Sequence, residues 1–169
     1  MYWASKGVDG NRSSGTSCHS MSTALRDTGQ CDATSWQYRG DTDETSTAYR
    51  PPAAAGVDLR RARLTRRSSS AIDDIRAALD RAAVSVLIID VWKQFYKPVS
   101  GVLTAPAPAD LLGTRHAVLA VGYSASDSEL LIRNSWSGTW GIHGHALMPF
   151  AAWGVAGIDA WVVEDDLDP

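Results

Sequence analysis

The sequence predicts an α+β fold, in which helices come early in the chain and an antiparallel sheet comes late. The segment VSVLIIDV, from Val84 to Val91, is mostly apolar and rich in β-branched residues, as expected of a buried strand. The length of 169 residues, with 44% hydrophobic and 21% charged residues, fits a globular chain. Further strand candidates lie at 116–123, 129–134, 143–148 and 158–164.

One helix is predicted near the start of the chain. Apolar side chains recur at helical spacing at Cys18, Met21 and Leu25. Gly29 follows at a position where a helix can end. We therefore expect a helix over about 17–28.

Irregular segments are predicted on both sides of this helix. Residues 1–16 have the composition of a loop, and residues 30–70 are polar and rich in turn-forming types. The second segment contains the basic run RRARLTRR at 60–67. Because this run has no interleaved aromatic residues, we expect a solvated loop rather than a nucleic-acid site.

A second helix is predicted immediately before the buried strand. Ser70 and Asp73 form a start that resembles a capping box, Ser-x-x-Asp. The predicted helix covers about 71–82 and runs directly into the strand. Its apolar stripe consists of Ile72, Ile75 and Leu79.

Composition and charge argue against several classes of function. The net charge of −3 and the pI near 5.7 are not those of a general nucleic-acid binder. No apolar stretch approaches the roughly 20 residues that span a bilayer, and the N-terminus lacks the pattern of an export signal. In such a chain Cys18 and Cys31 are expected as reduced thiols, which predicts a cytoplasmic location.

Two polar residues stand at the ends of predicted buried strands. His116 opens the apolar run AVLAVGY, and Asn134 follows a second apolar run. Either residue alone is more commonly structural, as a core histidine or a turn asparagine. Together they suggest that the amide oxygen fixes the imidazole tautomer and leaves the other nitrogen as a base or as the partner of a thiolate. Trp136 and Trp140 are expected to shield that bond from water.

These residues resemble the His and Asn signatures of papain-like cysteine peptidases. The likeness rests on HAVLAVGY at 116–123 and RNSWSGTWG at 133–141, which agree in residue types, order and spacing. It covers most of residues 15–164 and is strongest over 71–148. Other segments that look like the family are IDDIRAALDRAAVSVLIIDV, Phe95-Tyr96, Ser100-Gly101-Val102, Gly29-Gln30-Cys31 and Trp36-Gln37-Tyr38, where Gln37 replaces a proline.

The resemblance implies a papain-like α+β fold in a single domain over 1–169. Residues 71–169 are similar to a helix plus a nearly complete, β-rich right lobe, and residues 1–70 to the remnant of a truncated helical left lobe. By the same resemblance His116 is the catalytic imidazole and Asn134 its orienting group. The implied function is that of a peptidase that cleaves proteins or peptides through a thioester, with no cofactor and no metal.

The nucleophilic cysteine of the family has no secure counterpart in this chain. Cys18 stands at a predicted helix start, where the helix dipole favours a thiolate, and CHSMS echoes the family's Cys-Trp-Ala-Phe-Ser. However, Arg12 takes the place of the family's oxyanion glutamine, and the distance from Cys18 to Trp36 is too short for the family's long helix. The sequence therefore favours a late start at Met1, with the nucleophile segment missing and Cys18 at an ordinary helix position. Cys31 follows a helix C-terminus, where the dipole disfavours a thiolate.

Several alternatives stay open. In the first alternative, Cys18 serves as the nucleophile. In the second, the domain never used a thiol. A third is a papain-fold module that binds proteins or peptides without chemistry. A relative of transglutaminases or amidases is disfavoured, because those enzymes usually orient the base with Asp rather than with an asparagine such as Asn134. A truncated lobe also predicts little activity and self-association through an exposed apolar face.

Two weaker patterns are given structural interpretations. His143 and His145 alternate on a predicted strand and face the same side, but no Cys or acidic residue at ligand spacing completes a metal site. Trp92, Phe95 and Tyr96 are expected to pack in the core rather than to bind a ligand.

Overall fold

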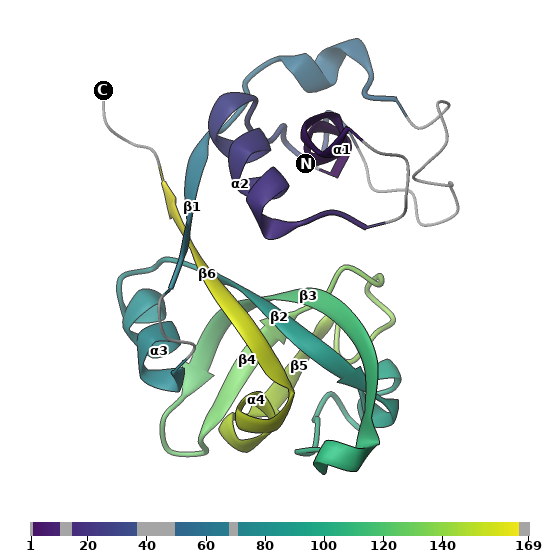
Figure 1. Ribbon diagram of the computed structural model, residues 1–169, viewed down its shortest axis with the longest axis vertical. Helices are drawn as coiled ribbons and strands as arrows, with labels where there is room; N and C mark the ends of the chain where they lie inside the picture. The colour runs from purple at the N-terminus through teal and green to yellow at the C-terminus, as the bar shows by residue number, and fades with distance from the viewer. Residues whose placement is uncertain (1, 11–14, 37–49, 68–70, 166–169) are drawn as a thin grey trace. The chain divides into compact units, whose positions relative to one another are not determined.

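The chain forms two compact units, which are described separately (Figure 1). The first unit is residues 1–65 with 164–169, and the second is residues 66–163. The computed structural model describes residues 2–10, 15–36, 50–67 and 71–165, without the side chain of residue 165. Among these residues no helix has the length and apolar character needed to cross a membrane.

The first unit contains two short helices, α1 (Tyr2–Asp9) and α2 (Cys18–Asp27), that pack on each other. Helix α2 confirms the predicted helix, and the Ser17 hydroxyl caps it by accepting the backbone N–H of Ser20 at 3.0 Å. The loop expected over 1–16 is wrong at Tyr2–Asp9, where the chain forms helix α1. Its eight residues bury only Ser5 completely, so no apolar periodicity marks it in the sequence.

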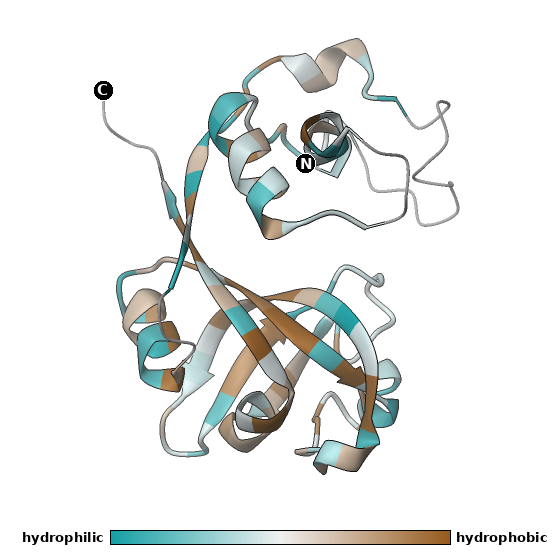
Figure 2. Ribbon diagram, viewed as in Figure 1, coloured by the Kyte–Doolittle hydropathy of each residue, from teal (hydrophilic) through white to brown (hydrophobic). Residues whose placement is uncertain are grey.

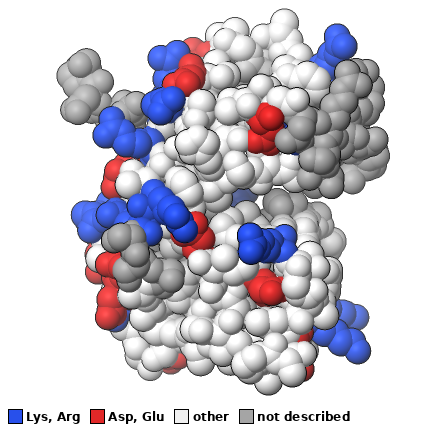
Figure 3. Space-filling model, viewed as in Figure 1, with Lys and Arg blue, Asp and Glu red and all other residues white. Residues whose placement is uncertain are grey.

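The basic run forms a strand rather than the expected loop. Strand β1 (Ala62–Arg66) buries Ala62 and Leu64 and turns the intervening Arg63 outward. This is the period of two that a half-buried strand requires, and the abundance of arginine hid it. Arg66 pairs with Asp159 at 3.0 Å, and Figure 3 shows acidic side chains among the basic ones on the face in view. A short 3₁₀ helix, η1 (Ala53–Gly56), precedes β1.

The second unit is built on an antiparallel sheet in which β2 (Ser85–Trp92) lies between β3 (Leu111–Ser124) and β6 (Gly157–Asp165). The strands β4 (Glu129–Arg133) and β5 (His145–Pro149) extend it beyond β3. The five strands predicted from 84 onward are thus all present, although β3 begins five residues before position 116.

Two helices pack on this sheet. Helix α3 (Ile72–Asp80) confirms the predicted helix and contacts β2 and β3. Its N-cap residue is Ala71, whose side chain makes no capping hydrogen bond, and the capping box expected from Ser70 stays a prediction. Ser70 itself lies outside the described residues, as do Gln37 and Tyr38. Helix α4 (Phe150–Ala156), which the sequence analysis did not foresee, contacts β2 and β5.

The core of the second unit is made of large side chains from the sheet, both helices and the segment after β2. Figure 2 shows the apolar residues running along β2 in brown. The 3₁₀ helix η2 (Lys93–Tyr96) adds Phe95, which is fully buried beside Trp92, as predicted. The prediction that Tyr96 packs in the core is wrong, because 52% of this residue is exposed. A further 3₁₀ turn, η3 (Pro108–Asp110), leads into β3.

Candidate active site

Strands β3 and β4 bring His116 and Asn134 together. His116 lies in β3, where it pairs with Ile89 of β2. Asn134 directly follows β4, which runs antiparallel to β3 from the pair Leu119–Arg133. The backbone N–H of Asn134 donates to the carbonyl of Gly144 at 2.9 Å and so fixes the turn that carries the side chain.

A hydrogen bond joins the two side chains. His116 Nε2 lies 2.8 Å from Asn134 Oδ1. The same oxygen accepts the backbone N–H of Ser135 at 2.8 Å, which identifies this end of the amide as the oxygen, because a flipped amide would place its NH2 group against the Ser135 N–H donor. An amide oxygen only accepts hydrogen bonds, so Nε2 carries the proton and Nδ1 is left as the basic nitrogen of the neutral ring.

Burial strengthens this contact. Asn134 is 7% exposed, and within the described residues its Nδ2 has no hydrogen-bond partner. His116 is half-buried. Burial lowers the pKa of His116 below its ordinary value, and the hydrogen bond to Asn134 opposes that shift in part. The neutral imidazole is therefore favoured near neutral pH, in the protonation state that a general base requires.

Aromatic rings surround the histidine. The ring of Trp136 lies 4.6 Å from the imidazole, centroid to centroid, at 36°. Phe95 presents an edge to His116 at 5.8 Å and to Trp136 at 5.4 Å. Trp140 is buried, packs on Phe95 at 5.2 Å, and donates its Nε1–H to the Phe95 carbonyl at 2.8 Å. The shielding role expected of the two tryptophans has this packing as its physical basis.

The loop between Asn134 and β5 needs glycine at one position. Gly141 has a φ of +58°, and a Cβ atom there would lie 2.1 Å from the carbonyl oxygen of His145. Any side chain would displace this backbone, because the close atom is a main-chain oxygen. Gly141 follows Trp140 directly, so the tight turn also places the indole that anchors the loop to Phe95.

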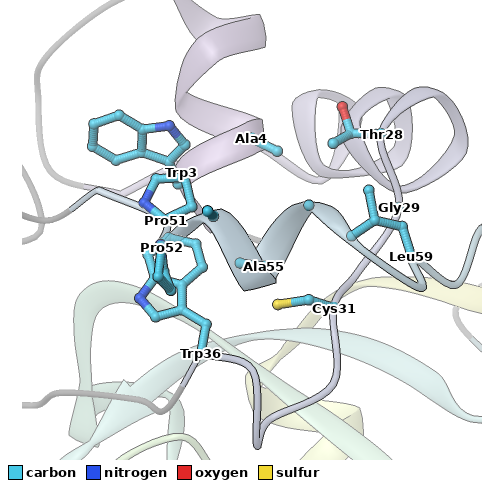
Figure 4. A pocket seen from close by; sticks show the side chains of 12 residues that line it. Trp3, Ala4, Thr28, Gly29, Cys31, Trp36, Pro51, Pro52, Ala55 and Leu59 are labelled. Atoms are coloured by element: carbon cyan, nitrogen blue, oxygen red, sulfur yellow. The ribbon is translucent and has the colours of Figure 1, made fainter.

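Both cysteines belong to the first unit, and neither forms a disulfide. Cys18 is the half-buried first residue of α2, a helix of ten residues. Cys31 lies beyond the end of that helix and lines a cavity of about 310 Å³ (Figure 4). The cavity walls are mainly apolar, with Trp3, Trp36, Pro51, Pro52, Ala55 and Leu59 among them.

The paired histidines of the sequence do not share a strand. His143 lies in a turn with a φ of +52°, and β5 begins only at His145. The Nδ1–H of His145 donates to the His143 carbonyl at 2.9 Å, which closes that turn. No group of three or more His, Cys, Asp or Glu side chains in the described part of the chain is arranged to hold a metal ion.

Sequence reasoning missed how Phe95 and Tyr96 relate to the site. Both were expected in the core, yet Phe95 contacts His116, and the ring of Tyr96 stacks on Trp136 at 5.3 Å and 16°. The segment KQFY has no strand or helix periodicity, so the sequence gives no sign of which ring faces inward. The sequence did indicate that both residues lie close to the end of β2, because only a few positions separate them from that strand.

Comparisons with known proteins identify the family of this chain. The family model described as papain family cysteine protease matches residues 6–163. An uncharacterised peptidase C1-like protein of Acanthamoeba polyphaga mimivirus is 26% identical over an alignment of 156 residues that covers 83% of this chain and 49% of the relative. Chymopapain of Carica papaya is 40% identical over 70 residues, which are 40% of this chain and 19% of that protein. The chain thus spans about half the length of the viral relative and a fifth of the plant one.

Solved structures show the same fold. Xylellain, a cysteine protease from Xylella fastidiosa, matches with a TM-score of 0.75 and 22% identity over 97% of this chain and 68% of that chain. A cysteine protease of Carica candamarcensis in complex with E-64 matches with a TM-score of 0.64 and 19% identity, over 97% of this chain and 87% of the other. The predicted α+β, papain-like fold is confirmed. Because the family model covers nearly the whole sequence, this chain belongs to the papain family of cysteine proteases.

Proposed function

We propose that this chain supplies the acid–base half of a cysteine peptidase site, with His116 as the general acid and base and Asn134 as its orienting group. We further propose that the nucleophilic thiol is neither Cys18 nor Cys31. The supporting observation is the 2.8 Å contact between His116 Nε2 and Asn134 Oδ1, with the Ser135 N–H on the same oxygen. This contact sets which imidazole nitrogen carries the proton.

The acylation step follows from that tautomer. Nδ1 takes the proton of a thiol that approaches on its side of the ring, and the resulting thiolate attacks the carbonyl carbon of a peptide bond. As the tetrahedral intermediate collapses, the imidazolium gives this proton to the leaving amine. The products of the step are a free amine and a thioester, and the imidazole is neutral again.

Hydrolysis of the thioester uses the same nitrogen. Nδ1 removes a proton from water, and the resulting hydroxide attacks the thioester carbonyl. The carbon–sulfur bond then breaks, the peptide acid is released, and the imidazolium returns the proton to the sulfur. Asn134 holds the ring in one orientation through both steps, and Trp136 and Phe95 keep water from the hydrogen bond that does so. The substrates would be proteins or peptides, and two structurally similar proteases that were solved in complex with E-64 support a protease function.

The first unit supports the second part of the proposal. Helix α2 has ten residues, far fewer than the long helix that begins with the nucleophile in the family that this chain resembles. Cys31 lies past a helix C-terminus and against an apolar wall, where no helix dipole favours a thiolate. Two thiols that form no disulfide also fit a reducing compartment such as the cytoplasm.

Alkylation by iodoacetamide tests the assignment of the thiol. The rate at Cys18 and at Cys31 is followed by mass spectrometry between pH 5 and 9, in the native chain and in His116→Ala. If neither cysteine is paired with the imidazole, both rates are the same in the two proteins. The chain alone is then also expected to cleave denatured casein no faster than the His116→Ala variant does.

A matched variant keeps the result interpretable. His145→Ala removes another imidazole of the second unit that lies outside the His116–Asn134 contact. If Cys18 alkylation near pH 6 slows in His116→Ala but not in His145→Ala, then Cys18 is the nucleophile and the proposal fails on this point. Casein cleavage that requires His116 and Cys18 together would lead to the same conclusion.

A further inference from the structure

An exposed tyrosine covers the outer face of the tryptophan beside the candidate histidine. The Tyr96 and Trp136 rings lie 5.3 Å apart at 16°, a nearly parallel stack. Trp136 in turn lies 4.6 Å from the imidazole of His116. The order of the rings is therefore Tyr96, Trp136, His116, from solvent toward the hydrogen bond to Asn134.

The short helix η2 explains why neighbouring residues take opposite roles. In a 3₁₀ helix successive side chains lie about 120° apart, so Phe95 and Tyr96 cannot both face inward. Phe95 is fully buried and presents its edge to Trp136 at 5.4 Å. Tyr96 is 52% exposed and meets the same indole by its face. The indole is thus held on two sides by consecutive residues of one turn.

We propose that Tyr96 is a positioning residue of the site, because its ring holds Trp136 against His116 and keeps water away from the His116–Asn134 hydrogen bond. This inference rests on the proposed role of His116 and adds a residue to it. Core packing does not account for the geometry, since a core residue would not leave half of its surface in solvent. The ring stack on Trp136 links Tyr96 to the site, so Tyr96 acts through Trp136.

Among the described residues, few charged side chains lie where they could change the pKa of His116. Arg115 is the chain neighbour of His116 and lies opposite Asp90 in the β2–β3 register, and on a strand it points to the other face of the sheet than His116 does. Asp90 Oδ1 accepts the backbone N–H of Thr114 at 3.1 Å. Lys93 and Lys97, at the two ends of the η2 turn, are exposed. Access of water to the ring is therefore the variable that Tyr96 controls.

Imidazole NMR of the intact chain tests this proposal. The four histidine rings are followed from pH 4 to 9, and His116→Gln identifies the signal of His116. In Tyr96→Ala, water reaches the ring, so the pKa of His116 rises toward its ordinary value near 6.5. The Nε2–H proton should also exchange with water roughly tenfold faster, because only local exposure is needed.

Two variants act as controls. Tyr96→Phe keeps the stacking ring and is expected to leave the titration and the exchange rate of His116 as they are in the native chain. Val99→Ala shortens another exposed apolar side chain in the segment that follows η2 and is expected to change neither. A general loosening of the fold would alter all three variants alike, whereas a positioning role affects Tyr96→Ala alone.

The outcomes separate this inference from the proposed function. If Trp136→Ala and Asn134→Asp both raise the pKa of His116 but Tyr96→Ala does not, the site stands and Tyr96 has no positioning role. If the nitrogen shifts show the proton on Nδ1 in the native chain, the orienting role of Asn134 fails, and the proposed function fails with it. A rise in Tyr96→Ala that Tyr96→Phe reverses supports the inference.

Discussion

The two units of this chain are packed with side chains of different size. In the described part of the first unit the buried residues are small apart from one leucine: Ser5, Ser20, Ala24, Ala55, Ala62 and Leu64. In the second unit the fully buried side chains include Phe95, Ile75, Leu87, Ile89 and Met148. The first unit also contains the apolar cavity of about 310 Å³. Large buried side chains thus characterise the second unit, whereas among the described residues of the first unit Leu64 is the largest that is buried.

The difference in packing matches the distribution of candidate chemistry. His116 and Asn134 need a fixed separation, and they lie on the strands of the densely packed unit. A hydrogen bond that orients a catalytic ring requires supports whose own rotamers are locked by neighbours. Cys18 and Cys31 lie in the unit without such supports. The comparison teaches that the candidate pair His116 and Asn134 lies in the more densely packed of the two units, and three changes test how far this contrast extends.

The largest effect is expected from Phe95→Ala. Phe95 is fully buried and touches Trp92, His116, Trp136 and Trp140, so its loss opens a cavity among aromatic rings. We expect the free energy of unfolding to fall by about 3–5 kcal/mol. Urea unfolding followed by circular dichroism measures the change.

Two further variants test whether the contrast between the units explains that cost. Phe95→Leu refills most of the volume and should cost only about 1 kcal/mol. Leu64→Ala removes the largest buried side chain described in the first unit and should cost about 2–3 kcal/mol, because its surroundings collapse more easily. Equal losses for Leu64→Ala and Phe95→Ala would show that the two units are packed alike.

A smaller effect is expected in the response to acid. Burial lowers the pKa of His116 in the folded chain, so between that value and about 6.5 the unfolded chain binds a proton that the folded chain does not. Stability from His116 is therefore complete above about pH 6.5 and is lost as the pH falls through the folded pKa. In the first unit, hydrogen bonds from Ser20 and Thr16 lower the pKa of Asp9. That contribution persists above about pH 3.8 and is lost only below it.

Unfolding free energies between pH 3 and 8 separate the two windows. In His116→Gln the slope just below about pH 6.5 should flatten, since the other three histidines remain in both proteins. In Asp9→Asn the upper window should be unchanged and only the region below about pH 4 should differ. A slope in the upper window that survives His116→Gln would assign it to another group.

The sequence predicted the second unit well because its patterns are strong. The apolar β2 and the runs around His116 and Asn134 have periodicity, and the antiparallel order of β3 and β4 follows from the short turn between them. The observed register, with Leu119 opposite Arg133, brings Asn134 near His116. Tyr96 was beyond prediction, because a four-residue 3₁₀ turn has no period that separates an inward ring from an outward one.

The first unit was harder to predict for the same physical reason that its core is sparse. Helix α1 buries a serine rather than a row of leucines, so it has no apolar stripe to detect. In β1 only Ala62 and Leu64 alternate with polar residues, and the arginines dominate the composition. Short elements that bury small side chains leave weak signals, and tertiary packing decides their structure.

The smallest effect is expected from filling the cavity of the first unit. Ala55 is buried on η1 and lines the cavity, whereas its neighbour Ala54 is exposed on the same turn. Ala55→Leu adds apolar atoms to open space, and we expect it to raise the free energy of unfolding by about 0.5–1 kcal/mol. Ala54→Leu makes the same substitution toward solvent and should change it by less than about 0.5 kcal/mol. Urea midpoints of the two variants give the difference directly.

The sign of that difference decides how the contrast between the units is understood. A gain for Ala55→Leu alone means that the first unit has unfilled apolar space, which the large side chains of the second unit do not leave. A loss of about 1–3 kcal/mol would instead be the cost of overpacking and would show that the walls around Ala55 are already close-packed. In that case small side chains would reflect tight packing of helices, and weak sequence signals would no longer imply a loosely filled core.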